Sequence, residues 1–175
     1  LRVYGRSFES VYAAGEERLS ITPPDDDYIN LMVLHGELRS DMGSDYNSVT
    51  PGFIESSGMD YIALGHIHKR TEIRRLGKTF YAYPGCPEGR GFDELGDKGV
   101  LVVTVDDGGA VSAEFVPLAR RRYEILTVDV TGAESPAAAL AAALPADAGE
   151  DCCRIVLTGE RGEEPPELAA LAEGD

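Results

Sequence analysis

The stretch Tyr61–His68, with the sequence YIALGHIH, decides the fold class of this chain. It opens with a short apolar run that is typical of a strand buried on both faces, and it ends in Gly-His-Ile-His. A second stretch, Ile29–Gly36 (INLMVLHG), has the same design and ends in His35-Gly36. Two buried strands that each lead into a histidine predict a sheet with its polar residues gathered at the strand ends.

The segment between these strands predicts helical cover for the sheet. A polar loop is expected through Asn47, and Thr50-Pro51 then supplies a capping side chain followed by a first-turn proline. The helix that begins there is expected to end near Ser57-Gly58. The order strand, loop, helix, strand predicts an α/β fold, in which a layered sheet is flanked by helices.

Downstream of His68 the sequence predicts two hairpins. The first pairs Thr71–Arg75 with Thr79–Tyr83, and the second pairs Val100–Val105 with Ala110–Val116 around two glycines. The intervening segment, Tyr83–Gly99 (YPGCPEGRGFDELGDKG), is too long for a simple connection. We therefore expect it to be functional or held by specific packing.

A cluster of three arginines that ends at Arg122 predicts a domain boundary, with residues 1–122 forming one domain and residues 123–175 a small second one. The second domain is predicted as strand Glu124–Val130, helix Ser135–Leu144, strand Arg154–Leu157 and a short helix that starts at Pro165-Pro166. About 50 residues bury little apolar surface, so we expect this β-α-β-α piece to dock on the first domain.

The net charge of −15 is unevenly distributed. Residues 1–123 carry 14 basic and 19 acidic side chains, whereas residues 124–175 carry 2 and 12. This excess argues against nucleic-acid binding by the acidic tail. No apolar run approaches the roughly 20 residues of a membrane span, so no membrane association is expected. The three cysteines form neither a disulfide framework nor a zinc motif, which predicts reduced thiols and a cytoplasmic location.

The only three histidines of the chain are candidate metal ligands. His35, His66 and His68 each follow a predicted strand, where α/β sheets place their ligand sites. On an extended backbone His66 and His68 would point to the same side, and Gly36 and Gly65 would let the backbone approach closely. Neutral imidazole suits manganese, iron or zinc. The alternative, hydrogen-bonded histidines with no ion, stays open at this point.

Three segments together resemble the calcineurin-like metallophosphoesterases. Leu31–Gly36 (LMVLHG) and Ala63–His68 (ALGHIH) are similar to the last two metal-ligand motifs of that family. The segment from Tyr83 to Val103 resembles the DNA-repair exonuclease branch, relatives of the SbcD nuclease subunit. The resemblance extends from about Val3 to Val130. It implies that residues 1–122 are the C-terminal half of a metallophosphoesterase β-sandwich flanked by helices, and that residues 123–175 belong to a small cap.

The resemblance also implies a function. Members hydrolyse phosphodiesters at two divalent metals, most often Mn²⁺, and by analogy His35 and His66 would hold one metal and His68 the other. The family's D-x-H, GDxxD and N-H-D/E motifs do not occur here. We therefore assign no catalytic residue to this chain and expect the general acid and the carboxylate ligands upstream of Leu1, so that this piece alone is inactive. DNA, an SbcC-like ATPase subunit and a second copy are the partners that the resemblance suggests.

The dense basic stretch after His68 raises a second set of candidates. Lys69, Arg70, Arg74 and Arg75, with Arg90 in the glycine-rich segment, are candidate contacts to the DNA backbone. The alternatives are a solvated, charged hairpin and a structural Arg90–Glu94 pair. At the level of function, two alternatives to a DNA nuclease stay open. One is an enzyme for small phosphoesters or cyclic nucleotides, and the other is a non-catalytic scaffold.

Overall fold

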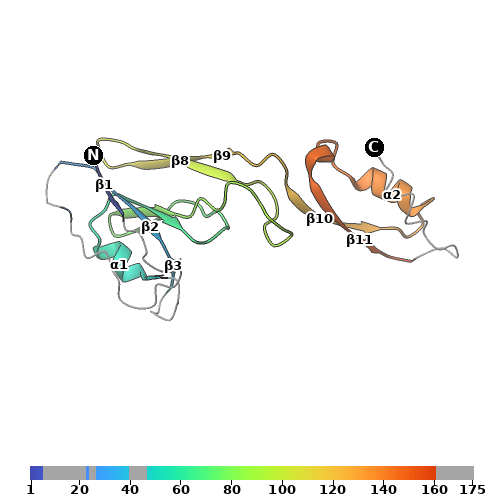
Figure 1. Ribbon diagram of the computed structural model, residues 1–175, viewed down its shortest axis with the longest axis horizontal. Helices are drawn as coiled ribbons and strands as arrows, with labels where there is room; N and C mark the ends of the chain where they lie inside the picture. Colours follow the sequence, from blue (N-terminus) through green and yellow to red (C-terminus); the bar gives the residue numbers. More distant parts are fainter. Residues whose placement is uncertain (6–22, 24–26, 40–46, 161–175) are drawn as a thin grey trace. The chain divides into compact units, whose positions relative to one another are not determined.

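The computed structural model describes residues 1–5, 23, 27–39 and 47–160 (Figure 1). These residues form a mixed α/β structure that is rich in strands and has few helices, which confirms the predicted fold class. They fall into two compact units: Leu1–Pro87 with Lys98–Leu118, and Glu88–Asp97 with Ala119–Asp175. The assignment of residues 1–122 to half of a catalytic domain and of residues 123–175 to a cap stays a prediction.

The first unit is built on a five-stranded sheet with the order β1-β2-β5-β7-β6. Four of its strands run parallel and β6 is antiparallel to β7. The strands are β1 (Arg2–Gly5), β2 (Asn30–His35), β5 (Tyr61–Gly65), β6 (Arg74–Leu76) and β7 (Thr79–Ala82). The predicted apolar runs thus form the interior strands β2 and β5. Strand β5 is largely buried on both faces, as predicted. In β2 burial alternates along the strand and Val33 is 56% exposed, so the prediction of two buried faces was wrong for this strand.

The core of this unit lies between the sheet and helix α1 (Pro51–Ser56). The Thr50 hydroxyl accepts a hydrogen bond from the Phe53 amide and caps the helix, as the sequence predicts. Ile54 of the helix is fully buried, and burying such a side chain contributes roughly 1.5–3 kcal/mol. The buried hydrophobic residues packed together in this core are Met32, Leu34, Val49, Ile54, Met59, Ile62, Leu64, Tyr81 and Tyr83.

Two parts of the sheet region depart from the prediction. Strand β1 was not expected, and the predicted polar loop after Gly36 contains strand β3 (Glu37–Leu38), which pairs with β4 (Ser48–Val49). The loop prediction was wrong there because the pairing is non-local, with the Glu37 amide donating to the Asn47 carbonyl at 3.1 Å. Local sequence patterns do not reveal such a partner.

The two hairpins occur where the turn signals predict them. The first, β6–β7, is shorter than expected and turns at Gly77, whose φ of 58° suits a residue without Cβ. The second joins β8 (Gly99–Val105) to β9 (Val111–Pro117) as a separate antiparallel pair. In its turn the Asp106 carboxylate accepts hydrogen bonds from two backbone amides, at 2.9 and 2.8 Å, and so fixes the loop.

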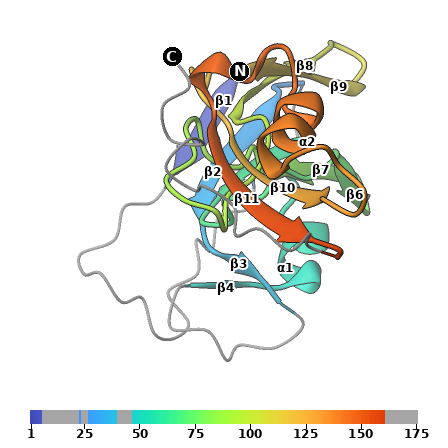
Figure 2. The ribbon, with the colours of Figure 1, turned by 90° about the vertical axis from the view of Figure 1, so that its right-hand side faces the viewer.

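The second unit contains a parallel pair of strands with a helix between them in sequence. Strand β10 (Tyr123–Asp129) pairs with β11 (Cys152–Thr158) over seven positions, and α2 (Pro136–Ala143) connects them through the short 3-10 turn η1 (Ala148–Glu150). Figure 2 shows β10 and β11 side by side with α2 next to them. The strand-helix-strand prediction is thus observed, and the predicted helix at Pro165-Pro166 lies outside the described residues.

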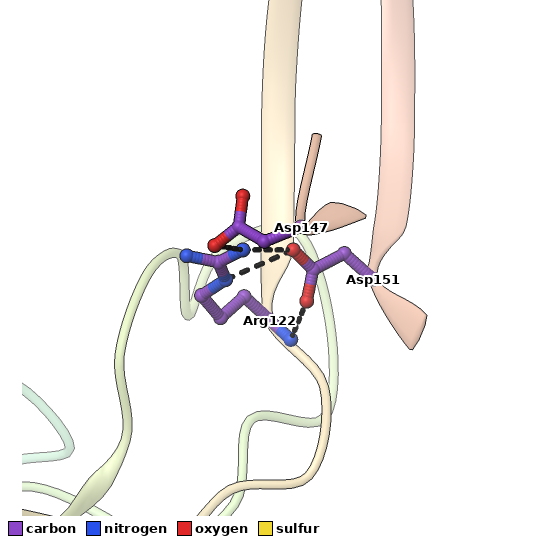
Figure 3. Close-up of polar contacts among 3 residues, drawn as sticks. All are labelled: Arg122, Asp147 and Asp151. Carbon is purple, nitrogen blue, oxygen red and sulfur yellow. Dashed lines mark hydrogen bonds and ion pairs between the residues drawn. The ribbon is translucent and has the colours of Figure 1, made fainter. Parts of the chain in front are cut away.

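Arg122 holds the beginning of this strand pair together (Figure 3). Its guanidinium donates to the Asp151 carboxylate at 2.9 and 2.6 Å and to Asp147 at 3.1 Å. Its backbone amide also donates to Asp151 at 2.7 Å, and its carbonyl accepts from the Cys152 amide at 2.8 Å. Because Asp151 precedes β11 and Arg122 precedes β10, this cluster sets the register at which the two strands begin pairing.

No helix in the described part of the chain has the length and apolar character that a membrane crossing requires.

Candidate metal centre

His35 and His66 meet at the carboxyl edge of the sheet. His35 is the last residue of β2, and His66 directly follows β5, the neighbouring parallel strand. In that pairing His35 lies opposite Gly65. The Nδ1 atom of His66 lies 3.3 Å from the Nε2 atom of His35, and the two rings meet edge to face at 5.2 Å. The structure thus brings two imidazole nitrogens from separate strands to one point.

Two glycines next to the histidines allow close packing of the backbone. A Cβ at Gly36 would lie 2.5 Å from the Asn47 carbonyl oxygen, so only glycine fits beside that backbone. A Cβ at Gly65 would lie 3.1 Å from Nδ1 of His35, so a side chain there would press on the imidazole. Gly65 therefore leaves room for the His35 ring, and Gly36 lets the loop after β2 pack against Asn47.

The backbone of His66 is strained. Its φ of 104° lies in the left-handed region, which L side chains rarely adopt and which costs about 1–3 kcal/mol. Such outliers persist only where the surrounding structure fixes them, and they cluster at functional sites. The expectation of an extended backbone from His66 to His68 was wrong, because β5 ends at Gly65 and the chain bends at His66. Alternation along a strand therefore does not set the directions of His66 and His68.

His68 lies in the same unit but is anchored differently. Its side chain is exposed, and its backbone carbonyl accepts a hydrogen bond from the thiol of Cys86 at 3.7 Å. Cys86 itself is buried, with 8% of its surface exposed. A Cβ at Gly85 would lie 3.0 Å from that same carbonyl, so the turn after β7 packs directly against the His68 backbone.

The electrostatics favour a neutral His35. Partial burial, followed by the nearby charges of His66 and then His68, lowers the pKa of His35 below its ordinary value of 6.5. Neutral imidazole is the form that offers a lone pair to a metal. The imidazole nitrogens of His35 and His66 are therefore suitable donor atoms for a metal ion. In the described part of the chain no third ligand completes that pair, so any ion held by it needs further ligands from elsewhere.

Two residues that the sequence prediction missed hold the loop after β2. The Asn47 side-chain amide donates to the His35 carbonyl at 2.9 Å, and the Tyr83 hydroxyl donates to the Gly36 carbonyl at 2.7 Å. The Gly36 amide in turn donates to the Gly65 carbonyl at 3.1 Å. A positive φ of 57° at Asn47 accompanies these bonds. The only sequence signal was the tyrosine of the YPG turn, which the family resemblance includes but to which it gives no role.

The basic candidates separate into two kinds. The guanidinium of Arg70 lies 4.0 Å above the Phe115 ring, and that of Arg75 lies 5.0 Å above Phe80 and donates to the Gly77 carbonyl at 2.9 Å. These two arginines thus pack on their own unit. Lys69 and Arg74 lie on the same segment after His68, and all four residues are exposed.

Arg90 belongs to the second unit. Its backbone amide donates to the Glu94 carboxylate at 2.8 Å, so the two residues do interact, although through the main chain of Arg90. Nearby, Phe92 meets Tyr123 edge to face at 5.2 Å and carries the Arg154 guanidinium at 4.2 Å above its ring. The glycine-rich segment is thus held by specific packing, one of the two expectations for it.

Comparison with known proteins bears on the family. The chain is 32% identical over 168 residues, 92% of its length, to YhaO, an uncharacterized metallophosphoesterase of Bacillus subtilis. It is 30% identical over 122 residues, 66% of its length, to the DNA double-strand break repair protein Mre11 of Methanopyrus kandleri. These relatives support a metallophosphoesterase family. No family model matches the chain.

The matched regions cover 41% of the Bacillus protein and 27% of the Methanopyrus protein, so the chain spans less than half of either relative. Metallophosphoesterases imply divalent metal ions, and the histidine pair at the sheet edge offers donors of the right chemistry.

Proposed function

We propose that the full-length protein containing this chain hydrolyses phosphodiester bonds in DNA at a centre of two divalent metals, to which His35, His66 and His68 contribute. The observation that carries the proposal is the 3.3 Å approach of the His35 and His66 nitrogens at the ends of neighbouring parallel strands. The strained backbone of His66 adds support, because a fold keeps such strain mainly where a side chain must occupy a particular place.

In this proposal the chain supplies nitrogen ligands and a rigid frame. When bound, divalent ions, with Mn²⁺ the expected species, would polarise the phosphate and make a water molecule a better nucleophile. The imidazoles of His35 and His66 would share one ion, and His68 would serve the other. The frame that orients them consists of parallel strands β2 and β5 and the hydrogen bonds from Asn47 and Tyr83. Carboxylate ligands and a general acid would come from outside this sequence.

DNA is the favoured substrate for two reasons. One relative is named as a DNA double-strand break repair protein, and Lys69 and Arg74 follow His68 as exposed cations suited to phosphate contacts. The name of the Bacillus relative specifies no substrate, so small phosphoesters are the second candidate. The proposal further includes an exonuclease activity of the SbcD type, an SbcC-like ATPase partner, a homodimer and a cytoplasmic location. It also includes the division of the chain into half of a catalytic domain, residues 1–122, and a cap.

The test compares His66→Ala and His68→Ala with wild type in the full-length protein. Each variant is assayed with Mn²⁺ on linear duplex DNA, bis-p-nitrophenyl phosphate and cyclic AMP. We expect each substitution to lower metal-dependent cleavage by roughly 100-fold or more, since even outer-shell changes cost 10–100-fold. Gly52→Ala in helix α1 is the control, because an added Cβ there meets no atom within 4 Å.

Cleavage near the wild-type level in either histidine variant would refute the ligand assignment. Activity on cyclic AMP and bis-p-nitrophenyl phosphate without activity on duplex DNA would instead keep the metal centre and replace the substrate class.

A further inference from the structure

We infer that Tyr83 is a positioning residue of the candidate metal centre, where it fixes the separation between the loop that follows β2 and the loop that follows β5. The inference rests on the proposed function, since it concerns the geometry of His35, His66 and His68 as ligands. Tyr83 follows β7, the strand next to β5. Its side chain bonds to the loop after His35, and its backbone bonds to Thr71, three residues after His68.

The side chain of Tyr83 holds the first loop. Its hydroxyl donates to the Gly36 carbonyl at 2.7 Å and accepts from the Leu38 amide at 2.9 Å. One oxygen atom therefore bonds to the backbone on both sides of Glu37. These partners lie 47 and 45 residues away in the sequence. Tyr83 is buried, with 4% of its surface exposed, so water does not readily replace either bond.

The backbone of Tyr83 holds the second segment. Its amide donates to the Thr71 hydroxyl at 3.0 Å, and its carbonyl accepts from the Thr71 amide at 3.0 Å. Two residues later, a Cβ added at Gly85 would lie 3.0 Å from the His68 carbonyl oxygen and 3.1 Å from the Arg70 amide nitrogen, so the backbone at Gly85 packs closely against this segment. The residues from His68 to Thr71 are therefore fastened to the same short stretch that carries the Tyr83 ring.

A single residue thus connects His35-Gly36 on one side with the segment after His66 on the other. This connection matters for an ion because metal-ligand distances must be met to within about 0.2 Å. The direct link between the two loops, from the Gly36 amide to the Gly65 carbonyl, is one hydrogen bond of 3.1 Å. Without the Tyr83 hydroxyl, the buried Gly36 carbonyl and the partly buried Leu38 amide lose their shared partner, and the loop that directly follows His35 becomes free to shift.

The experiment uses Tyr83→Phe in the full-length protein, which removes the hydroxyl and keeps the ring. The matched control is Tyr61→Phe, the same change in another buried tyrosine at the start of β5, at the strand end away from His66. The primary readout is the Mn²⁺ concentration that gives half-maximal cleavage. We expect it to rise roughly 10–100-fold for Tyr83→Phe and less than about threefold for Tyr61→Phe. At saturating Mn²⁺, kcat for Tyr83→Phe should recover to near wild type.

Thermal unfolding of the metal-free proteins separates positioning from a general loss of stability. If both tyrosine variants lower Tm to a similar extent and only Tyr83→Phe loses metal affinity, the positioning role holds. An unchanged Mn²⁺ requirement in Tyr83→Phe would overturn it, and so would an equal rise in Tyr61→Phe. The His66→Ala variant is measured alongside to distinguish a failure of this inference from a failure of the proposed function. Full metal-dependent cleavage by His66→Ala would refute the metal centre itself, and not only the role of Tyr83.

Discussion

Replacing His66 by glycine and, in parallel, by alanine separates the backbone strain at this position from the chemistry of its imidazole. Both substitutions remove the ring that lies 3.3 Å from His35. Alanine keeps the Cβ that makes a φ of 104° unfavourable, whereas glycine adopts such a conformation readily. The two variants therefore share the loss of a ligand and differ in strain.

The magnitude follows from two opposing effects. A non-glycine residue in this region costs about 1–3 kcal/mol, and glycine removes that cost. Glycine also gives the unfolded chain more freedom, which lowers stability by roughly 0.4–1 kcal/mol relative to alanine. The strain outweighs the entropy, so we expect the His66→Gly variant to be more stable than the His66→Ala variant by about 1 kcal/mol.

The assay is urea unfolding of the metal-free full-length proteins. With a denaturant dependence of about 2 kcal/mol per molar, a difference of 1 kcal/mol moves the midpoint by roughly 0.5 M, provided that the slope is the same in both variants. Metal-dependent cleavage should be lost in both. If the alanine variant is as stable as the glycine variant, His66 carries no backbone strain, and strain no longer supports a functional role for this residue.

Three further predictions concern the rest of the chain. The hydrogen bond from the Arg122 side chain, followed by the one from its backbone amide, lowers the pKa of Asp151 below its ordinary value of 3.8. The stability that this carboxylate gives is thus present above about pH 4 and lost as the pH falls through the lower folded value. Denaturation at a series of pH values should therefore show lower stability at neutral pH for Asp151→Asn and a flatter acid dependence. Gly36→Ala places a Cβ 2.5 Å from a backbone oxygen and should lower the free energy of unfolding by about 1–3 kcal/mol, whereas Gly52→Ala should change it by less than about 0.5 kcal/mol. Arg74→Gln should weaken binding to all DNA sequences alike and reduce the salt dependence of the affinity by about one counterion, as titrations at several salt concentrations would measure.

The parts of the fold that the sequence predicted are those set by local patterns. The apolar runs before His35 and His66 identify β2 and β5 as strands, although only β5 is largely buried on both faces and burial alternates along β2. The cap at Thr50 and the glycine at position 77 identify the start of α1 and a hairpin turn for similar local reasons. Strands β3 and β4 escaped prediction because a two-residue strand has no pattern of its own and exists only through its distant partner.

The candidate site likewise has features that the sequence predicts and features that it does not. The sequence shows that His35 and His66 each follow an apolar run. Neighbouring parallel strands bring their carboxyl ends to the same edge of the sheet, and with them the two histidines. The contact of Arg70 with Phe115 could not be predicted, because the two residues are far apart in the sequence. Arg75 and Phe80, in contrast, lie opposite each other in the predicted β6–β7 hairpin. All four basic residues are exposed, so Lys69, Arg70, Arg74 and Arg75 all stay candidates for contacts to DNA.

By itself the sequence determined strands β2 and β5, the hairpin turns and the identity of the three histidines, because apolar runs, glycines and prolines act on their immediate neighbours. Tertiary structure alone decided the 3.3 Å meeting of two imidazoles, the bend at His66 and the place of Tyr83 between the two loops. Those features depend on the β2–β5 register and on contacts across 47 residues of chain, and no local pattern specifies a distance over such a span.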